Sequence, residues 1–111
     1  MGVRPFQGPR QERITVEELL QALEREYAIQ GRKSLPQLHS HLKHIRRFFG
    51  MDRALAVTSA RLRDYIASRQ QQGALPASIN RGLEGLQRAF VLAAESGLNE
   101  CRAEIPQLAG A

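Results

Sequence analysis

The chain has 111 residues, of which 42% are hydrophobic and 24% charged, so we expect one small packed domain and exclude a multidomain enzyme or a disordered segment. The single cysteine, Cys101, excludes an intrachain disulfide, and the sequence shows neither a signal-peptide pattern nor an apolar run near the roughly 20 residues that cross a bilayer, so we expect a cytoplasmic protein. Sixteen Lys and Arg against 11 Asp and Glu give a net charge of +5, which favours an anionic partner.

Residues 1–14 contain two Pro, two Gly and three Arg with little periodicity, which predicts a flexible lead-in or an interdomain linker. Thr15 and Glu18 then have the spacing of a capping box, in which both side chains satisfy backbone N–H groups of the first helical turn. The apolar residues that follow recur every three or four positions and predict a helix to about Gln30, with Gly31 as its stop. They are Val16, Leu19, Leu20, Leu23 and Tyr27.

A second helix is predicted from Ser34 to Phe49, with Gly50 as its stop. Pro36 is tolerated in its first turn because the missing N–H would have no partner there. The apolar stripe of this helix consists of Leu35, Leu38, Leu42, Ile45 and Phe49.

A third helix is predicted from a cap at Thr58 or Ser59 to about Gln72, with Gly73 as its stop. Its buried residues are expected to be Leu62, Tyr65 and Ile66.

The fourth helix is predicted to start near Pro76 and to end before Gly97. Gly82 and Gly85 lie inside it and each costs about 1 kcal/mol relative to Ala, which predicts that another helix approaches closely at these two positions. The inward-facing residues are Ile79, Leu83, Leu86, Phe90 and Ala93. A short fifth turn at residues 99–105 would be limited by Pro106.

The predicted fold is all-α, because no stretch shows the alternation of apolar and polar residues that is typical of a β-strand. Four amphipathic helices with short loops bury their apolar stripes most simply as a compact four-helix bundle, or as two helical hairpins packed across each other.

The basic charge is concentrated in the second helix and the loop before it. Residues 32–49 contain five basic side chains, all three histidines and no carboxylate. Cations without neighbouring acids repel one another, and phosphates that neutralise them relieve this repulsion, so the run favours a nucleic acid as the partner. An acidic protein partner and an ordinary solvated face remain as alternatives. At 100° per residue, the side opposite the apolar stripe carries Lys33, Gln37, Ser40, Lys43, His44 and Arg47.

The fourth helix has a second polar face, formed by Arg81, Glu84 and Arg88. Ser78 and Asn80 lie in its first turn, where free backbone N–H groups suit a phosphate. The alternative is that Ser78 or Asn80 only caps the helix.

Motifs for catalysis are absent from the sequence. The tyrosines, Tyr27 and Tyr65, lie on apolar stripes, and Cys101 is interpreted as a bystander thiol. The spacing of His39, His41 and His44 does not put all three on one helix face, and no P-loop or GxGxxG motif is present. We therefore expect no catalytic residues, no metal, no cofactor and no small-molecule substrate.

The segment from Ile14 to Gly97 resembles the core-binding, SAM-like domain of tyrosine recombinases of the phage integrase family. The residues that carry the resemblance are Thr15–Leu19, Gly31–Leu35, Leu42–Gly50, Leu55–Thr58, Tyr65–Arg69, Gly73 and Ala74, then Ala77–Arg81 with Leu83, Leu86, Phe90 and Ala93. Ser78 stands where the family usually has Thr, and Gly82 stands where it more often has a larger residue.

The resemblance implies a four-helix domain, residues 15–97, that clamps duplex DNA with its second and fourth helices beside other subunits of the same recombinase. Catalysis in the family belongs to a separate domain, so residues 98–111 would be a tail or the start of a linker to it, and residues 1–14 would follow an arm-type DNA-binding domain. The expected DNA contacts are Lys33, Ser34, Gln37, Ser40, Lys43, His44, Arg47, Ser78, Asn80, Arg81 and Arg88. The alternative is a helical protein-interaction or oligomerisation module whose basic face binds an acidic partner.

Overall fold

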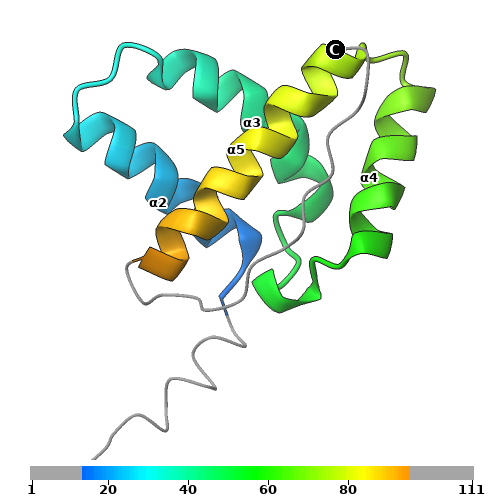
Figure 1. Cartoon of the computed structure of the whole chain (residues 1–111), viewed down its shortest axis with the longest axis horizontal. Helices are drawn as coiled ribbons and strands as arrows, with labels where there is room; N and C mark the ends of the chain where they lie inside the picture. The colour runs from blue at the N-terminus through cyan, green and yellow to red at the C-terminus, as the bar shows by residue number, and fades with distance from the viewer. Residues whose placement is uncertain (1–13, 96–111) are drawn as a thin grey trace, which may run out of the picture.

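Four α-helices and one short 3-10 helix form the secondary structure of residues 14–95, the part of the chain that the computed structural model describes (Figure 1). They are α2 (Val16–Ile29), α3 (Leu35–Phe49), η1 (Ala54–Ala56), α4 (Ser59–Gln71) and α5 (Pro76–Glu95). This part contains no strand, and an isolated antiparallel bridge joins Thr15 to Arg53. The all-helical prediction is confirmed for these residues; the 3-10 turn was not predicted.

The helix boundaries follow from capping residues in the sequence. At the start of α2, the Thr15 backbone N–H donates to Glu18 Oε1 at 3.0 Å and the Glu18 N–H donates to Thr15 Oγ1 at 3.3 Å, which completes the predicted capping box. Thr58 caps α4 with its hydroxyl. The chain leaves α2 and α4 through Gly31 and Gly73, whose φ values of 66° and 84° are unfavourable for other residues.

Helices α2, α3 and α5 pack against one another around one core, and α4 lies beside them (Figure 1). The α4 residue Tyr65 joins α4 to α3, because its ring centroid lies 5.4 Å from those of both Phe48 and Phe49. The predicted apolar stripes are buried, except that Leu35 is only half-buried. Within the described part of the chain, no helix has both the length and the apolar character needed to span a membrane.

Two glycines allow α5 to lie close to α3, as predicted. A Cβ atom at Gly82 would stand 3.2 Å from the carbonyl oxygen of His41 and 3.3 Å from Cγ1 of Ile45. A Cβ at Gly85 would stand 2.7 Å from Cδ2 of Leu42, well inside van der Waals contact. The absence of side chains at these positions therefore sets how closely the two helices pack.

The packed core includes one residue that was expected to lie outside it. Ile14, which the sequence placed in the lead-in, is buried, and its carbonyl oxygen accepts a hydrogen bond from the Ala54 N–H at 2.7 Å. Ile14 therefore belongs to the core next to η1. The rest of the predicted lead-in, the tail at residues 98–111, the turn at residues 99–105 and Cys101 lie outside the described residues.

Candidate nucleic-acid interface

The polar face of α3 is presented on the surface as predicted. Its apolar stripe fills the core, so the residues on the opposite side remain accessible. His44 is half-buried, and the other candidates in and before α3 are exposed: Lys33, Ser34, Gln37, Ser40, Lys43 and Arg47.

The candidates on α5 divide into two groups. Ser78, Arg81 and Arg88 are exposed. Asn80 is only 6% exposed, so it is not available on the surface as a DNA contact. The physical reason is that α5 packs against α2, α3 and α4, which widens its buried side beyond the stripe that was predicted.

The structure brings the polar faces of α3 and α5 together along one groove. Three adjoining hollows form it, and we call them together the basic groove. The first is lined on its polar side by Ser34, Gln37, His41, Arg81, Glu84 and Arg88. The second is lined by Ser40, His41, His44, Arg69, Ala77, Ser78 and Arg81, and the third by His44, Arg47, Phe48, Tyr65, Ser68, Arg69 and Gln72.

The basic groove contains most of the predicted contacts, and it is also lined by polar residues that were not predicted. Lys33 and Lys43 are exposed but line none of the three hollows. His41 and Arg69 line the groove and were not among the candidates. Arg69 could have been noticed, because it lies four residues after Tyr65 and therefore continues the apolar stripe of α4 with a charged side chain.

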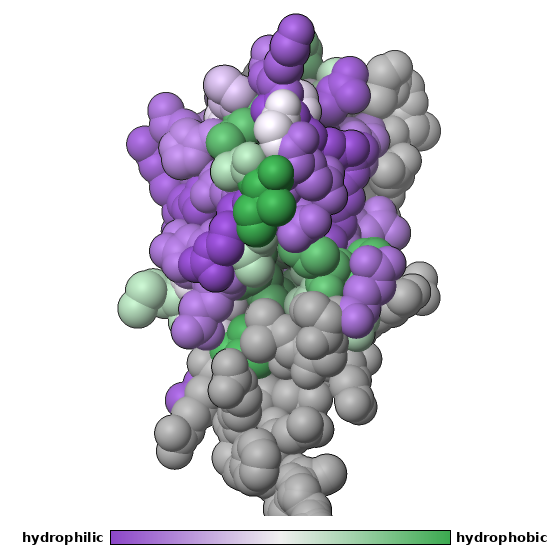
Figure 2. All heavy atoms as spheres, turned by 90° about the vertical axis from the view of Figure 1, so that its left-hand side faces the viewer, coloured by the Kyte–Doolittle hydropathy of each residue, from purple (hydrophilic) through white to green (hydrophobic). Residues whose placement is uncertain are grey.

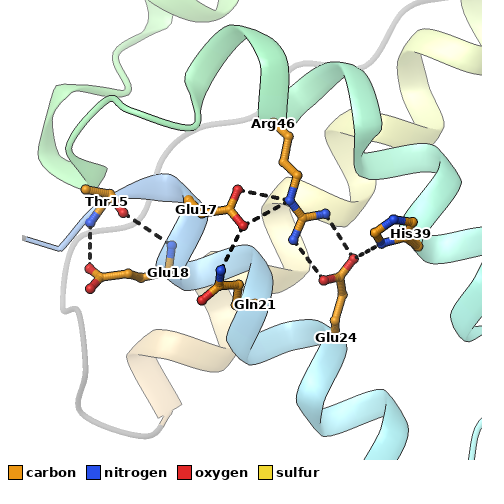
Figure 3. A network of polar contacts seen from close by, with 7 residues as sticks. All are labelled: Thr15, Glu17, Glu18, Gln21, Glu24, His39 and Arg46. Carbon is orange, nitrogen blue, oxygen red and sulfur yellow. Dashed lines mark hydrogen bonds and ion pairs between the residues drawn. The ribbon is translucent and has the colours of Figure 1, made fainter.

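Arg46, one of the five cations of residues 32–49, is paired with carboxylates outside the groove, which corrects the expectation that this run of cations has no acidic partner. The Arg46 guanidinium donates to Glu17 Oε1 at 2.9 Å and to both oxygens of Glu24 at 2.8 and 3.0 Å (Figure 3). His39 Nδ1 lies 2.8 Å from the same Glu24 carboxylate. The carboxylates come from α2, which packs on α3, so the local sequence could not show the pairing.

The Glu24 carboxylate has a lowered pKa in this network. Burial raises the pKa, but hydrogen bonds and charges from Arg46 and His39 together outweigh burial and hold the pKa of Glu24 below its ordinary value of 4.5. Arg46 and Glu24 therefore stabilise the packing of α3 on α2, and they do not line the basic groove.

Two further arginines contact Tyr27, which the sequence assigned to the core. The Tyr27 ring is buried, but its hydroxyl accepts a hydrogen bond of 2.6 Å from Nη1 of Arg88. The Arg32 guanidinium lies over the same ring at 4.4 Å from its centroid. Arg88 is thereby held at the end of the groove, and Arg32 covers the side of α2.

The positive charge of the groove affects the pKa of His44. Burial lowers the pKa of His44, and the positive charges of Arg69, Arg47 and Lys43 lower it further below 6.5. An anion in the groove would be attracted by the same charges that oppose protonation of His44.

The surface on the side of the α2–α3 turn is mainly hydrophilic, with a small central group of hydrophobic residues (Figure 2). The large exposed hydrophobic side chains of residues 14–95 are spread over several elements: Ile29, Met51, Leu55 and Leu75. Among these same residues, no three His, Cys, Asp or Glu side chains are grouped as they would be to hold a metal ion. The basic groove is therefore the strongest candidate site.

Comparison with known proteins identifies no relative: no protein-family model, curated protein or solved structure matches this chain.

Proposed function

We propose that this chain is a duplex-DNA-binding module of a tyrosine recombinase, equivalent to its core-binding domain. In this proposal α2–α3 and α4–α5 are the two crossed hairpins of a SAM-like fold. The module grips the DNA and positions the cleavage site, while the chemistry is performed by another domain of the recombinase. Other subunits bound to the same DNA would be its protein partners.

The observation that carries the proposal is the convergence of basic and hydrogen-bonding side chains from three helices on one groove. Arg47 comes from α3, Arg69 from α4, and Arg81 and Arg88 from α5. Glu84 is the one carboxylate among the residues that line the three hollows. Such a surface suits a row of phosphates, because phosphate contacts provide most of the affinity and position the protein on DNA.

The side chains between the arginines can donate and accept hydrogen bonds. Gln37 and Ser40 lie on the exposed face of α3, and Ser78 lies in the first turn of α5. A helix in the major groove contacts base edges with side chains of this kind. Lys33 and Lys43, which are exposed and line none of the three hollows, would contact flanking phosphates.

The test is a fluorescence-anisotropy titration of a labelled duplex of about 25 bp at several salt concentrations. The logarithm of the binding constant should fall with log salt at about −0.9 for each phosphate neutralised, and we expect a slope that corresponds to several phosphates. The double variant Arg47→Ala/Arg81→Ala should lose most of this slope while circular dichroism shows unchanged helix content.

The matched control is Arg25→Ala/Arg63→Ala, which removes the same charge from exposed positions on α2 and α4 that line none of the three hollows. An equal loss in both double variants would overturn the role of the groove. A competition arm decides between partners: unlabelled duplex should displace the probe, and displacement by an acidic peptide of equal charge at similar concentration would instead favour the protein-interaction module.

A further inference from the structure

The second of the three hollows lies between the other two, because it shares lining residues with both, and we call it the middle hollow. It has features that the general DNA-binding proposal does not require. It lies where the start of α5 meets α3 and the end of α4, and Arg69 and Arg81 line it together with the hydroxyl-bearing Ser40 and Ser78. The two arginines come from different helices, so only the tertiary structure places both of them at this position.

Arg69 is buried without a carboxylate partner. It is 9% exposed, its Nη1 donates to Gln72 Oε1 at 2.9 Å, and its buried Nε has no hydrogen-bond partner. The less buried arginines Arg46 and Arg61 each pair with a carboxylate, at 2.8 and 2.9 Å, whereas no carboxylate within residues 14–95 pairs with Arg69. A buried guanidinium that lacks an anion is costly, and an added anion would offset that cost.

The first turn of α5 contributes backbone donors to the same hollow. Ala77 and Ser78 both line it, and their N–H groups have no intrahelical acceptor because they belong to the first turn of a 20-residue helix. The preceding residue, Leu75, has no side-chain acceptor with which to cap them. The partial positive charge of the helix start therefore adds to the charges of Arg69 and Arg81.

We propose that this middle hollow is a discrete phosphate site, in which one phosphate group accepts hydrogen bonds from Arg69, Arg81 and the first turn of α5. The inference rests on the proposed function for the source of that phosphate, which is one particular position of the DNA backbone. Bound there, this phosphate would fix the register of the module on the duplex, whereas the exposed cations would attract neighbouring phosphates with less geometric constraint.

The first experiment uses inorganic phosphate and the whole chain. Titration followed by NMR should shift the backbone amides of Ala77 and Ser78 and the Arg69 Nε–H signal in a saturable manner, while chloride at matched ionic strength should not. Arg81→Gln, at an exposed position that does not endanger folding, should weaken phosphate binding roughly tenfold or more, since it removes a charge-assisted hydrogen-bond donor. Arg47→Gln is the matched control, because Arg47 does not line this hollow, and it should leave phosphate binding unchanged.

The second experiment uses a set of duplexes in which single phosphates are replaced by neutral methylphosphonates. One backbone position should weaken binding far more than the others, and this difference should disappear in Arg69→Gln and Arg81→Gln. Circular dichroism first checks that Arg69→Gln has the native helix content. If it does not, the result for Arg81→Gln alone decides the test.

The outcomes separate this inference from the proposed function. A salt-dependent affinity for duplex, with equal effects at every methylphosphonate position and no saturable shift at Ala77 and Ser78, would overturn the discrete site and leave the DNA-binding proposal standing. A saturable phosphate site in a chain that fails to bind duplex at low salt would support the site and overturn the DNA-binding function.

Discussion

Arg46 on α3 and Glu24 on α2 form a bidentate ion pair, with Nη1–Oε2 and Nη2–Oε1 distances of 3.0 and 2.8 Å (Figure 3). Their side chains are only 21% and 18% exposed, so the pair is largely shielded from water. The neighbouring Arg47 points to the opposite side and lines the basic groove. Two adjacent arginines therefore have different roles, one in folding and one in the proposed interface.

Arg46→Ala is expected to destabilise the domain by about 1–3 kcal/mol, because two carboxylates lose charge-assisted hydrogen bonds that water only partly replaces. Urea unfolding followed by circular dichroism at pH 7 measures this. Arg47→Ala is the control and should shift the free energy of unfolding by less than about 0.5 kcal/mol, as is usual for an exposed position. Equal losses in the two variants would contradict this division of roles.

The network should also make stability depend on acid pH through Glu24. Its pKa is lower in the folded state than the ordinary 4.5, because Arg46 and His39 outweigh the effect of burial, so the folded state favours the ionised form. This contribution to stability is present above the unfolded-state pKa and is lost as the pH falls through the folded-state pKa. Glu24→Gln should therefore destabilise the domain at pH 7, and its difference from the wild type should shrink at pH 3. A difference that stays constant over this range would show that Glu24 contributes through packing only.

Gly85→Val is expected to destabilise the domain by about 1–3 kcal/mol through overpacking, because a Cβ at this position would lie 2.7 Å from Leu42 Cδ2 in the core. Gln87→Val places the same side chain on the exposed side of α5 and should cost less than about 0.7 kcal/mol, which is the effect of helix propensity alone. Thermal unfolding of both variants tests the close approach of α3 and α5. Stabilisation by Gly85→Val would mean that Leu42 can move aside.

If the groove binds phosphates, DNA affinity should rise as the pH falls through the range in which His44 titrates. Burial and then the charges of Arg69, Arg47 and Lys43 lower the pKa of His44 in the free protein. A bound phosphate offsets those charges and raises this pKa, so binding takes up a proton and the affinity increases by up to about tenfold per pH unit.

The measurement is duplex affinity from pH 8 to pH 5.5 at fixed ionic strength, for the wild type and His44→Gln. The variant should show a flatter profile. The other titratable or charged residues that line the two hollows containing His44 are His41, Arg47, Tyr65, Arg69 and Arg81. His39→Gln is the control, since His39 contacts Glu24 and lies outside the groove. Identical profiles in the wild type and His44→Gln would rule out His44 as the linked group.

The sequence by itself determined the helices of this protein. The capping residues Thr15 and Thr58, the stops at Gly31 and Gly73 and the apolar periodicity all act over a few residues, so they can be interpreted locally. The exposed face of α3 was predictable for the same reason, because the position of its apolar stripe fixes the opposite side.

Only the tertiary structure decided how those faces are used. Arg46 meets a carboxylate 22 residues away on α2, Asn80 is buried because three helices cover α5, and Arg69 enters the groove from α4. Charge pairing and burial depend on which side chains from distant segments come within a few ångströms, and helical periodicity carries no information about these distances. The sequence therefore indicates where the positive charge is, and the packing of the helices determines which of these charges remain available to a partner.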